Sequence, residues 1–387
     1  MPELRCRICA AAYPIGPLFF GCPACAAQGR KAALEVHYTQ PPAKFPDPTK
    51  TGIWQWLDLL PCTDGVSLGE GGTPLTLLRP GLYIKNESCN PTWSYKDRAA
   101  AVSISMARQF KLPATVAIST GNLGNAVAAY SAAAEMRCTI FCNPDAPELQ
   151  PALMQLYGAR VFRGGNANAL VRQYVERGTV FPATICCPLG GFANPYAIEG
   201  FKTIAFEIWQ QLGRVPDRVF APAGSGDGLY GIWKGFRELR DFGLTDTVPR
   251  MIACQAEGAA CYAKALATNA SAPVPIRRPR TVALSIAEEY GGYPALTAIR
   301  DSDGDAVTTD EEQILWAMGA LAAKGIALEP ASVTPFAIAS ALDPQQQDET
   351  WVLIGTGSLA KWPPLVTQGF ALPNALPPDF DNLDQLM

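Results

Sequence analysis

Lys96 is the residue of this 387-residue chain whose surroundings most clearly suggest chemistry. It lies in the segment Asn-Pro-Thr-Trp-Ser-Tyr-Lys-Asp-Arg at 90–98, after a turn-forming Asn-Pro pair and directly before an alanine-rich, helical segment at 99–110. A lysine amine can form a Schiff base with a carbonyl compound, and from the first turn of a helix it can reach into a cleft. A lysine in this setting is common, so the other segments decide what it means.

A glycine-rich loop, Gly-Ser-Gly-Asp-Gly at 224–228, follows an apolar run and precedes a helical pattern that begins at Leu229. Glycines let backbone N–H groups approach an anion closely, and the N-terminus of a helix adds a favourable partial charge. A dinucleotide-binding loop is the alternative, but its G-x-G-x-x-G pattern is not met. Asp227 would repel a phosphate if it pointed inward, so we expect its side chain to face outward.

Two further polar segments follow short apolar runs. Ser-Thr-Gly-Asn-Leu-Gly at 119–124 leads into an alanine-rich helix, and Gly-Thr-Gly-Ser-Leu-Ala-Lys at 355–361 follows the run at 351–354. By itself the first could be a strand-to-helix turn capped by Ser or Thr. Both are therefore interpreted together with the lysine and the glycine loop.

In this order and at this spacing, the segments resemble those of the pyridoxal-phosphate (PLP) enzymes of the tryptophan-synthase-β type, called fold type II. The branch that the chain resembles most is that of threonine synthase and its relatives. The similarity extends from about Leu68 to about Lys361 and begins with Leu-Gly-Glu-Gly-Gly-Thr-Pro-Leu at 68–75. It therefore covers most of the chain.

The resemblance implies a role for each segment. Lys96 would hold PLP as a Schiff base and, once freed by the substrate, move the Cα proton. Asn122 would contact the phenolic oxygen of PLP, and Thr356, with Ser358 as the other candidate, its pyridine nitrogen. The PLP phosphate would be bound by Gly224, Ser225, Gly226, Asp227 and Gly228. The substrate carboxylate would be bound by Ser119, Thr120, Gly121 and Leu123.

A neutral hydroxyl at the pyridine nitrogen would not force its protonation. The cofactor would then be a weaker electron sink, which suits elimination at carbons beyond Cα better than transamination. The segment 325–332, Gly-Ile-Ala-Leu-Glu-Pro-Ala-Ser, also resembles the family. We interpret it as scaffold.

One segment departs from the threonine synthase pattern. Where these enzymes carry a run like N-S-x-N-P-x-R-x-E-G-Q-K-T, residues 191–203 have Gly191, Phe192, Ala197 and Phe201 in place of the first Asn, the Ser, the Arg and the Gln. Losing an arginine weakens phosphate binding. Trp93, where the family commonly has Gly, would narrow the pocket further, so Trp93, Phe192 and Ala197 are expected to contact the substrate. Compensating donors elsewhere in the fold are the alternative.

Three hypotheses about function follow. The first is a PLP-dependent lyase or synthase acting on a small amino acid by β- or γ-elimination or replacement, through an aminoacrylate-type intermediate. The second is threonine synthase itself, which forms threonine and phosphate from O-phosphohomoserine. The third is a PLP-binding regulatory protein without turnover. The intact lysine and both loops argue against the third.

Residues 1–36 form a separate pattern. Cys6 and Cys9, and then Cys22 and Cys25, make two C-x2-C pairs with glycines and prolines between them. Four thiolates can converge on one Zn²⁺ and stabilise a module too small to fold on its own core. We expect a closed, structural zinc site of the zinc-ribbon type, which part of the threonine synthase group also carries. Four free cysteines in a flexible arm are the alternative.

The remaining elements indicate an α/β fold. Short β-branched runs at 115–118, 139–142, 159–162, 218–221 and 351–354 alternate with helical patterns, including one at 229–242. This alternation predicts parallel or mostly parallel sheets flanked by helices. With the family resemblance, we expect two lobes: a large PLP-binding domain at 37–102 and 195–387, and a small α/β domain at 103–194. Trp54 and Trp56, after a proline-rich connector, are expected to pack on the main body.

Composition excludes several classes of protein. A net charge of −4 and no basic stripe argue against nucleic acid as a partner. The sequence has no apolar run long enough to span a bilayer and no signal-peptide core, so we expect a cytoplasmic protein without membrane contact. The single histidine, His37, excludes Ser-His-Asp chemistry unless it is itself the base. The family resemblance implies a homodimer that acts on a small-molecule amino acid.

Overall fold

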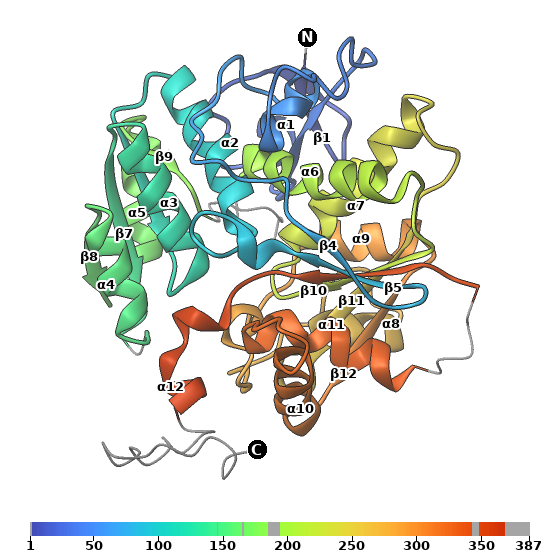
Figure 1. Cartoon of the computed structure of the whole chain (residues 1–387). Helices are drawn as coiled ribbons and strands as arrows, with labels where there is room; N and C mark the ends of the chain where they lie inside the picture. The colour runs from blue at the N-terminus through green and yellow to red at the C-terminus, as the bar shows by residue number, and fades with distance from the viewer. Residues whose placement is uncertain (1, 145, 165, 185–193, 343–347, 368–387) are drawn as a thin grey trace.

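The computed structural model of the protein describes residues 2–144, 146–164, 166–184, 194–342 and 348–367. The described residues form three sheets, which are joined and covered by helices (Figure 1). Two of the sheets lie in separate lobes, and the third belongs to a small module at the N-terminus. The expected mixed α/β fold with two lobes is confirmed.

The larger lobe is built on a six-stranded sheet with the order β12-β11-β10-β13-β5-β4. All neighbouring strands are parallel except β4 and β5, which pair antiparallel. The strands are β4 (Leu75–Arg79), β5 (Leu82–Asn86), β10 (Arg218–Pro222), β11 (Arg250–Ala256), β12 (Asp305–Thr309) and β13 (Trp351–Gly355).

Both faces of this sheet are buried. Val219 belongs to the apolar core that includes α6 and α7, whereas the next residue, Phe220, belongs to the core formed with α10 and α11. In the same way, Val352 belongs to the core with α6 and α7, and Leu353 belongs to the core with α10 and α11. Successive side chains on a strand point to opposite faces, so a strand buried on both sides is apolar throughout. This explains the uninterrupted apolar runs in the sequence.

The smaller lobe is built on a four-stranded parallel sheet with the order β8-β7-β6-β9. Its strands are β6 (Ala114–Ile118), β7 (Arg137–Cys142), β8 (Arg160–Arg163) and β9 (Phe181–Pro182). Its helices are α3 (Asn122–Ala133), α4 (Leu149–Leu156) and α5 (Ala167–Glu176). These elements lie inside the range 103–194 expected for the small domain, whereas α2 (Lys96–Gln109) crosses the expected boundary at 102. The precise domain limits remain a prediction.

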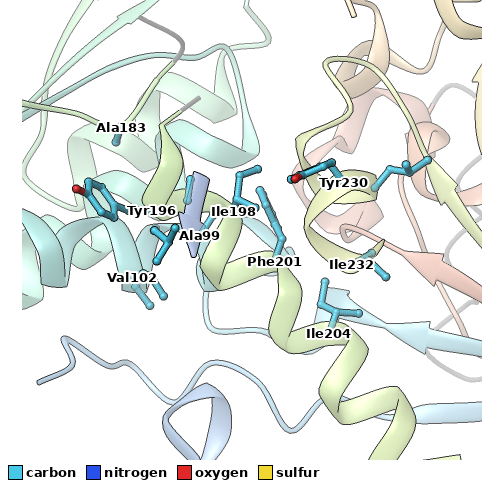
Figure 2. Packing of buried hydrophobic residues seen from close by; sticks show 14 of the residues in the cluster. Ala99, Val102, Ala183, Tyr196, Ile198, Phe201, Ile204, Tyr230 and Ile232 are labelled. Carbon is cyan, nitrogen blue, oxygen red and sulfur yellow. The ribbon is translucent and has the colours of Figure 1, made fainter. Parts of the chain in front are cut away.

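Three helices, α2, α6 (Pro195–Leu212) and α7 (Asp227–Asp241), pack together between the two large sheets (Figures 1 and 2). Helix α6 begins where the Asn194 side chain accepts hydrogen bonds from the backbone N–H groups of Tyr196 and Ala197, and it ends at Gly213, which has φ +69°. Asparagine at the N-cap and left-handed glycine after the last turn are the ordinary signals for these two ends. Phe201 and Ile204 point from α6 toward α7 (Figure 2).

The remaining helices cover the large sheet and the chain ends. Helix α9 lies on the same side of the sheet as α7, and α11 lies on the opposite side with α10 outside it (Figure 1). They are α1 (Pro23–Ala26), α8 (Cys261–Ala267), α9 (Tyr293–Asp301), α10 (Glu311–Ala322), α11 (Pro330–Ala341) and α12 (Pro363–Thr367). Among the residues described, none of the helices is long and apolar enough to cross a membrane.

The N-terminal module is a three-stranded antiparallel sheet, β1 (Glu3–Cys6), β2 (Ala12–Pro14) and β3 (Leu34–His37), with the order β2-β1-β3. It lies against α6 and α7 (Figure 1). After it, Trp54 and Trp56 lie in a short 3₁₀ helix, and the ring of Trp56 is 5.5 Å from that of Phe206 on α6. Both tryptophans belong to the main buried apolar cluster and thus pack on the main body, as expected.

Candidate active site

A cavity of about 830 Å³ opens between the two large sheets, and most of the predicted site residues line it. The loops that reach it follow the carboxyl ends of parallel strands: 119–123 after β6, 224–228 after β10, and Thr356 after β13. Ligands of open parallel sheets bind at this edge. Segments more than 200 residues apart in the sequence thus meet at one place.

Lys96 is the first residue of α2, and its side chain lines the cavity. The Nζ atom lies 4.9 Å from the centre of the Tyr95 ring and 5.1 Å from that of Phe201. Burial acts to lower the pKa of Lys96, but Tyr95, Asp227 and Glu288 outweigh it and raise the pKa above its ordinary value. Before a cofactor is attached, the amine therefore favours its charged form.

The glycine loop turns sharply into α7. Gly226 has φ +88°, and a Cβ atom there would lie 2.3 Å from Oη of Tyr262. A Cβ at Gly228 would lie 2.6 Å from the Tyr95 ring. Gly226, the N-cap residue of α7, has no side chain, so it cannot cap the first N–H groups of the helix with a side-chain hydrogen bond. This is an arrangement that binds anions.

Asp227 does not face solvent, which corrects the expectation from the sequence. Its side chain is 4% exposed, it lines the cavity, and its charge raises the pKa of Lys96. The reason lies in the geometry of the loop: the left-handed turn at Gly226 starts α7 with Asp227 on the buried side of the helix.

In the loop 119–124 the hydroxyl of Ser119 is used locally. Its Oγ atom accepts hydrogen bonds from the backbone N–H groups of Gly121 (3.3 Å) and Gly124 (2.9 Å). Asn122 lies deeper, and its Nδ2 atom donates to both carboxylate oxygens of Glu329 at 2.9 Å. Its Oδ1 atom is buried without a partner among the residues described. Thr120, Gly121 and Leu123 line the cavity.

The two hydroxyl candidates after β13 are placed differently. Thr356 is buried in the cavity wall, and its Oγ1 atom lies 2.7 Å from Oγ of Ser332. Ser358 does not line the cavity, and its hydroxyl accepts a hydrogen bond from the N–H of Ala360 (3.2 Å) at the start of a short 3₁₀ helix. Thr356 is thus the candidate that a ligand could reach.

The residues expected at the substrate end are only partly brought together. Ala197 and Phe201, both on α6, line the cavity. Gly191 and Phe192 lie outside the described residues. Trp93 is 43% exposed and does not line the cavity, so it does not narrow the pocket as expected. Its φ of +63° and the hydrogen bond from Ser358 N–H to its carbonyl direct the indole to the surface.

Among the residues of the cavity wall that sequence reasoning missed are Tyr95, Glu288 and Glu329. Glu329 lies in the segment interpreted as scaffold, yet it accepts hydrogen bonds from Asn122 and from Nε1 of Trp362 (2.6 Å). Its place in a family-like motif was the available signal. Glu288 lies in the segment between α8 and α9, where no local pattern marks it. Burial raises its pKa, although Lys96 acts in the opposite direction.

The chain matches the family model described as pyridoxal-phosphate dependent enzyme over residues 66–357. It is 35% identical to a threonine synthase of Methanosarcina acetivorans, covering 95% of this chain and 94% of the relative. It is 33% identical to a threonine synthase of Methanocaldococcus jannaschii, covering 99% and 98%.

The chain belongs to the pyridoxal-phosphate dependent enzymes.

Solved structures of this family share the fold. Processed threonine deaminase isoform 2 from Solanum lycopersicum matches with a TM-score of 0.66 at 21% identity, over 87% of this chain and 99% of the other. Maize serine racemase matches with a TM-score of 0.60 at 18% identity, over 74% and 87%. The TM-scores support the expected fold type II. The sequence identities are too low to carry an argument about the substrate.

The cavity suits PLP on three structural observations. The uncapped N-terminus of α7 offers backbone donors for a phosphate, and the close contacts at Gly226 and Gly228 leave no room there for larger residues. The lysine amine points into the same cavity. The buried Oδ1 atom of Asn122 has no protein partner among the residues described, so it can accept a hydrogen bond from a bound group.

The N-terminal module holds a candidate metal centre. The Sγ atoms of Cys6, Cys9, Cys22 and Cys25 all lie within 4.8 Å of one another, with separations of 3.7 Å for Cys6 and Cys25 and 3.6 Å for Cys9 and Cys22. Tetrahedral zinc with Zn–S bonds of about 2.3 Å requires sulfur atoms about 3.8 Å apart. The four thiolates therefore fit one Zn²⁺ with all four positions taken by cysteine.

Proposed function

We propose that this PLP-dependent enzyme is a lyase or synthase that acts on a small amino acid by elimination or replacement at Cβ or Cγ. The observation that carries the proposal is the meeting of Lys96, the loop 119–123, the uncapped glycine loop and Thr356 in one cavity. Together they supply a proton carrier, donors for a carboxylate, donors for a phosphate, and a neutral hydroxyl for the ring.

Each group has a task in such a reaction. PLP, when bound, withdraws electrons from the Cα atom of an amino acid attached to it. The 119–123 loop orients the substrate carboxylate, and the N-terminus of α7 holds the cofactor phosphate. When the substrate displaces Lys96 from the cofactor, its Nζ would be released as a neutral amine that can accept the proton from Cα, and the ammonium group so formed can return a proton to the leaving group or to the product. The Tyr95 and Phe201 rings beside Nζ exclude water from this transfer.

The charges of the cavity support a substrate without a phosphate tail. Among the described residues that line it, Lys96 is the only cationic side chain, whereas Asp227, Glu288 and Glu329 are acidic. The segments outside the described residues contain no lysine, arginine or histidine. A second phosphate would therefore face three carboxylates with no side-chain cation beyond the lysine that the cofactor itself uses.

Threonine synthase is the second candidate, favoured by the relatives from Methanosarcina acetivorans and Methanocaldococcus jannaschii at 33–35% identity over nearly the whole chain. In that case backbone donors would have to bind the phosphate of O-phosphohomoserine. A regulatory protein without turnover is disfavoured because the chain belongs to a family of enzymes.

The test is an absorbance titration of the purified, PLP-loaded protein. The panel is L-serine, L-threonine, O-acetylserine, O-phosphoserine, homoserine and O-phosphohomoserine. A change of the visible spectrum with an unphosphorylated amino acid, followed by release of a keto acid or a replacement product, supports the proposal. A response confined to O-phosphohomoserine, with release of phosphate and threonine, would establish threonine synthase instead.

Two further proposals concern assembly. The four cysteines of the N-terminal module bind one structural Zn²⁺, which metal analysis of the purified protein tests directly. The family resemblance implies a homodimer, which light scattering on the eluted protein would distinguish from a monomer.

A further inference from the structure

Three tyrosines connect the N-terminal module, residues 3–37, to helices that border the active-site cavity. They are Tyr196 on α6, Tyr230 on α7 and Tyr293 on α9, and each phenol is hydrogen-bonded to the module. The bonded residues are 180, 195 and 260 positions apart in the sequence. We call these three residues the tyrosine tethers.

Tyr196 tethers the substrate end of the cavity. Its Oη atom accepts a hydrogen bond from the N–H of Gly16 (3.2 Å) and donates to the carbonyl of Gly16 (2.5 Å). The next residue, Ala197, lines the cavity. The ring itself is fully buried, 5.5 Å from Phe110, near the start of α6 (Figure 2). The position of Gly16 therefore bears directly on the wall that Ala197 forms.

Tyr230 and Tyr293 tether the glycine loop from two sides. The hydroxyl of Tyr230 donates to Glu35 on β3, and its backbone N–H donates to the carbonyl of Gly226 (2.9 Å). The Oη atom of Tyr293 accepts from the N–H of Ala33 (3.1 Å).

The residue before Tyr293 completes the second connection. The N–H of Gly292 donates to the carbonyl of Ser225 (2.8 Å), in the middle of the glycine loop. The backbone N–H that bonds to the loop expected to hold the cofactor phosphate thus belongs to Tyr230 itself in the first case and to the residue directly before Tyr293 in the second.

The tethered backbone groups are in turn held by the cysteine segments. The N–H of Cys22 donates to the carbonyl of Ala32 (2.9 Å), and the N–H of Arg7, beside Cys6, donates to the carbonyl of Ala33 (3.3 Å). Gly16 lies in the loop between Cys9 and Cys22. A metal ion that fixes the four thiolates would also fix the residues to which the tyrosines are hydrogen-bonded.

We propose that Tyr196, Tyr230 and Tyr293 are positioning residues through which metal loading of the cysteine module sets the geometry of the PLP cavity, so that metal and PLP strengthen each other's binding. The proposal depends on the family membership and on the metal fit of the four cysteines, but not on which amino acid the enzyme uses. A module that only stabilised the chain end would need no hydrogen bonds directed to three helices beside one cavity.

The test measures PLP affinity by fluorescence in metal-loaded and chelator-treated protein, for the wild type and for Tyr196→Phe/Tyr293→Phe. The double variant keeps both rings and loses both phenol tethers. In the wild type we expect metal removal to weaken PLP binding by about 5- to 150-fold, the usual range of coupling between sites. In the double variant, which keeps only the Tyr230 tether, we expect this ratio to fall. Metal affinity in the wild type must rise with PLP by the same factor as PLP affinity rises with metal.

The control is Tyr174→Phe, an exposed tyrosine on α5, which must leave the ratio unchanged. Far-UV circular dichroism and a cooperative melting curve establish that each protein is folded. If the metal-free chain does not fold, the single variants Tyr196→Phe and Tyr293→Phe are compared with the wild type in metal-loaded form. Equal PLP affinity in both metal states, an unchanged ratio in the double variant, or unchanged affinity in the metal-loaded single variants would each overturn the proposal.

Discussion

The behaviour of Lys96 follows from its immediate surroundings. Its amine lies between two aromatic rings and near Asp227 and Glu288, which hold its pKa above the ordinary value. Lys96 would hold the cofactor, and once its amine is freed the acidic groups nearby would favour a proton on it. The same side chain can therefore anchor PLP and move the Cα proton.

Replacing Lys96 with alanine removes both tasks. We expect Lys96→Ala to lose the covalent cofactor linkage and to lower turnover by about 10³-fold or more, since general acid–base catalysis alone contributes about 10²- to 10⁴-fold. The measurements are the visible spectrum of the PLP-loaded variant and its rate. Lys264→Ala, at an exposed position on α8, serves as the control. A lysine-linked spectrum in Lys96→Ala would refute the assignment.

The hydroxyl of Ser332 determines how Thr356 can act. Ser332 Oγ accepts a hydrogen bond from the N–H of Gly357 (2.7 Å), and Thr356 Oγ1 is its other partner at 2.7 Å. Either hydroxyl of this buried pair can be the donor, and one arrangement has Ser332 donating to Thr356. The proton of Thr356 is then free to be donated to a group in the cavity.

Removing Ser332 leaves this arrangement incomplete. We expect Ser332→Ala to lower the free energy of unfolding by about 1–3 kcal/mol, because the buried N–H of Gly357 loses its partner. Urea denaturation of the variant measures the loss. Ser271→Ala, on the surface, should change the free energy of unfolding little. A loss no greater than that of the control would mean that Gly357 has found another acceptor.

At the scale of elements, the site depends on how closely α2 and α6 approach each other. Gly200 on α6 faces the backbone of α2, and a Cβ atom there would lie 2.1 Å from the carbonyl oxygen of Arg98. Helix α2 begins with Lys96, and α6 carries Ala197 and Phe201. A shift between these two helices would therefore change the cavity itself.

Two glycine-to-alanine substitutions separate close packing from helix propensity. Gly200→Ala should destabilise the protein by about 1–3 kcal/mol or more, because α2 and α6 must move apart. Gly319→Ala, on the exposed side of α10 with no atom within 4 Å of the new Cβ, should stabilise it by about 1 kcal/mol. Chemical denaturation of both variants gives the sign of each change in the free energy of unfolding. The same sign for both would contradict the packing argument.

At the scale of the whole molecule, a buried ion network joins the large sheet to the central helices. Arg98 on α2 contacts Glu87 after β5 and Glu207 on α6, each at 2.7 Å, and Lys85 on β5 contacts Glu207 at 2.6 Å. These side chains are no more than 2% exposed. Each charge is balanced only when all three elements are in place, so the network favours one arrangement of sheet and helices.

This network makes stability depend on pH. Burial acts to raise the pKa of Glu207, but Arg98 and Lys85 outweigh it and lower the pKa to about 2, below the ordinary 4.5. Because the folded pKa is depressed, the contribution is complete above pH 4.5 and is lost as the pH falls toward 2, by about 3 kcal/mol. Unfolding free energies measured across this range should fall less steeply in Glu207→Gln. Glu176→Gln, in an exposed pair, should retain the wild-type slope.

The sequence predicted the parts of the site that are encoded locally. Lys96 after its turn, the glycine loop at 224–228 and Thr356 after the run at 351–354 each follow from residue type and neighbouring periodicity, and they lie in the cavity wall. The four cysteines converge because two short C-x2-C turns need only one hairpin to meet. The predicted side-chain directions of Asp227 and Trp93 were wrong, because they depend on the backbone torsion angles of single residues.

The sequence by itself determined the family, the cofactor, the α/β fold and the residues at the ends of its strands, since short-range patterns fix turns, strands and helix starts. Only the tertiary structure decided which charged groups face the cavity, as Glu288 and Glu329 show. It also decided how the N-terminal module is hydrogen-bonded to α6, α7 and α9. These features depend on contacts between residues up to 260 positions apart. No local pattern records such contacts, because packing of the whole chain brings the partners together.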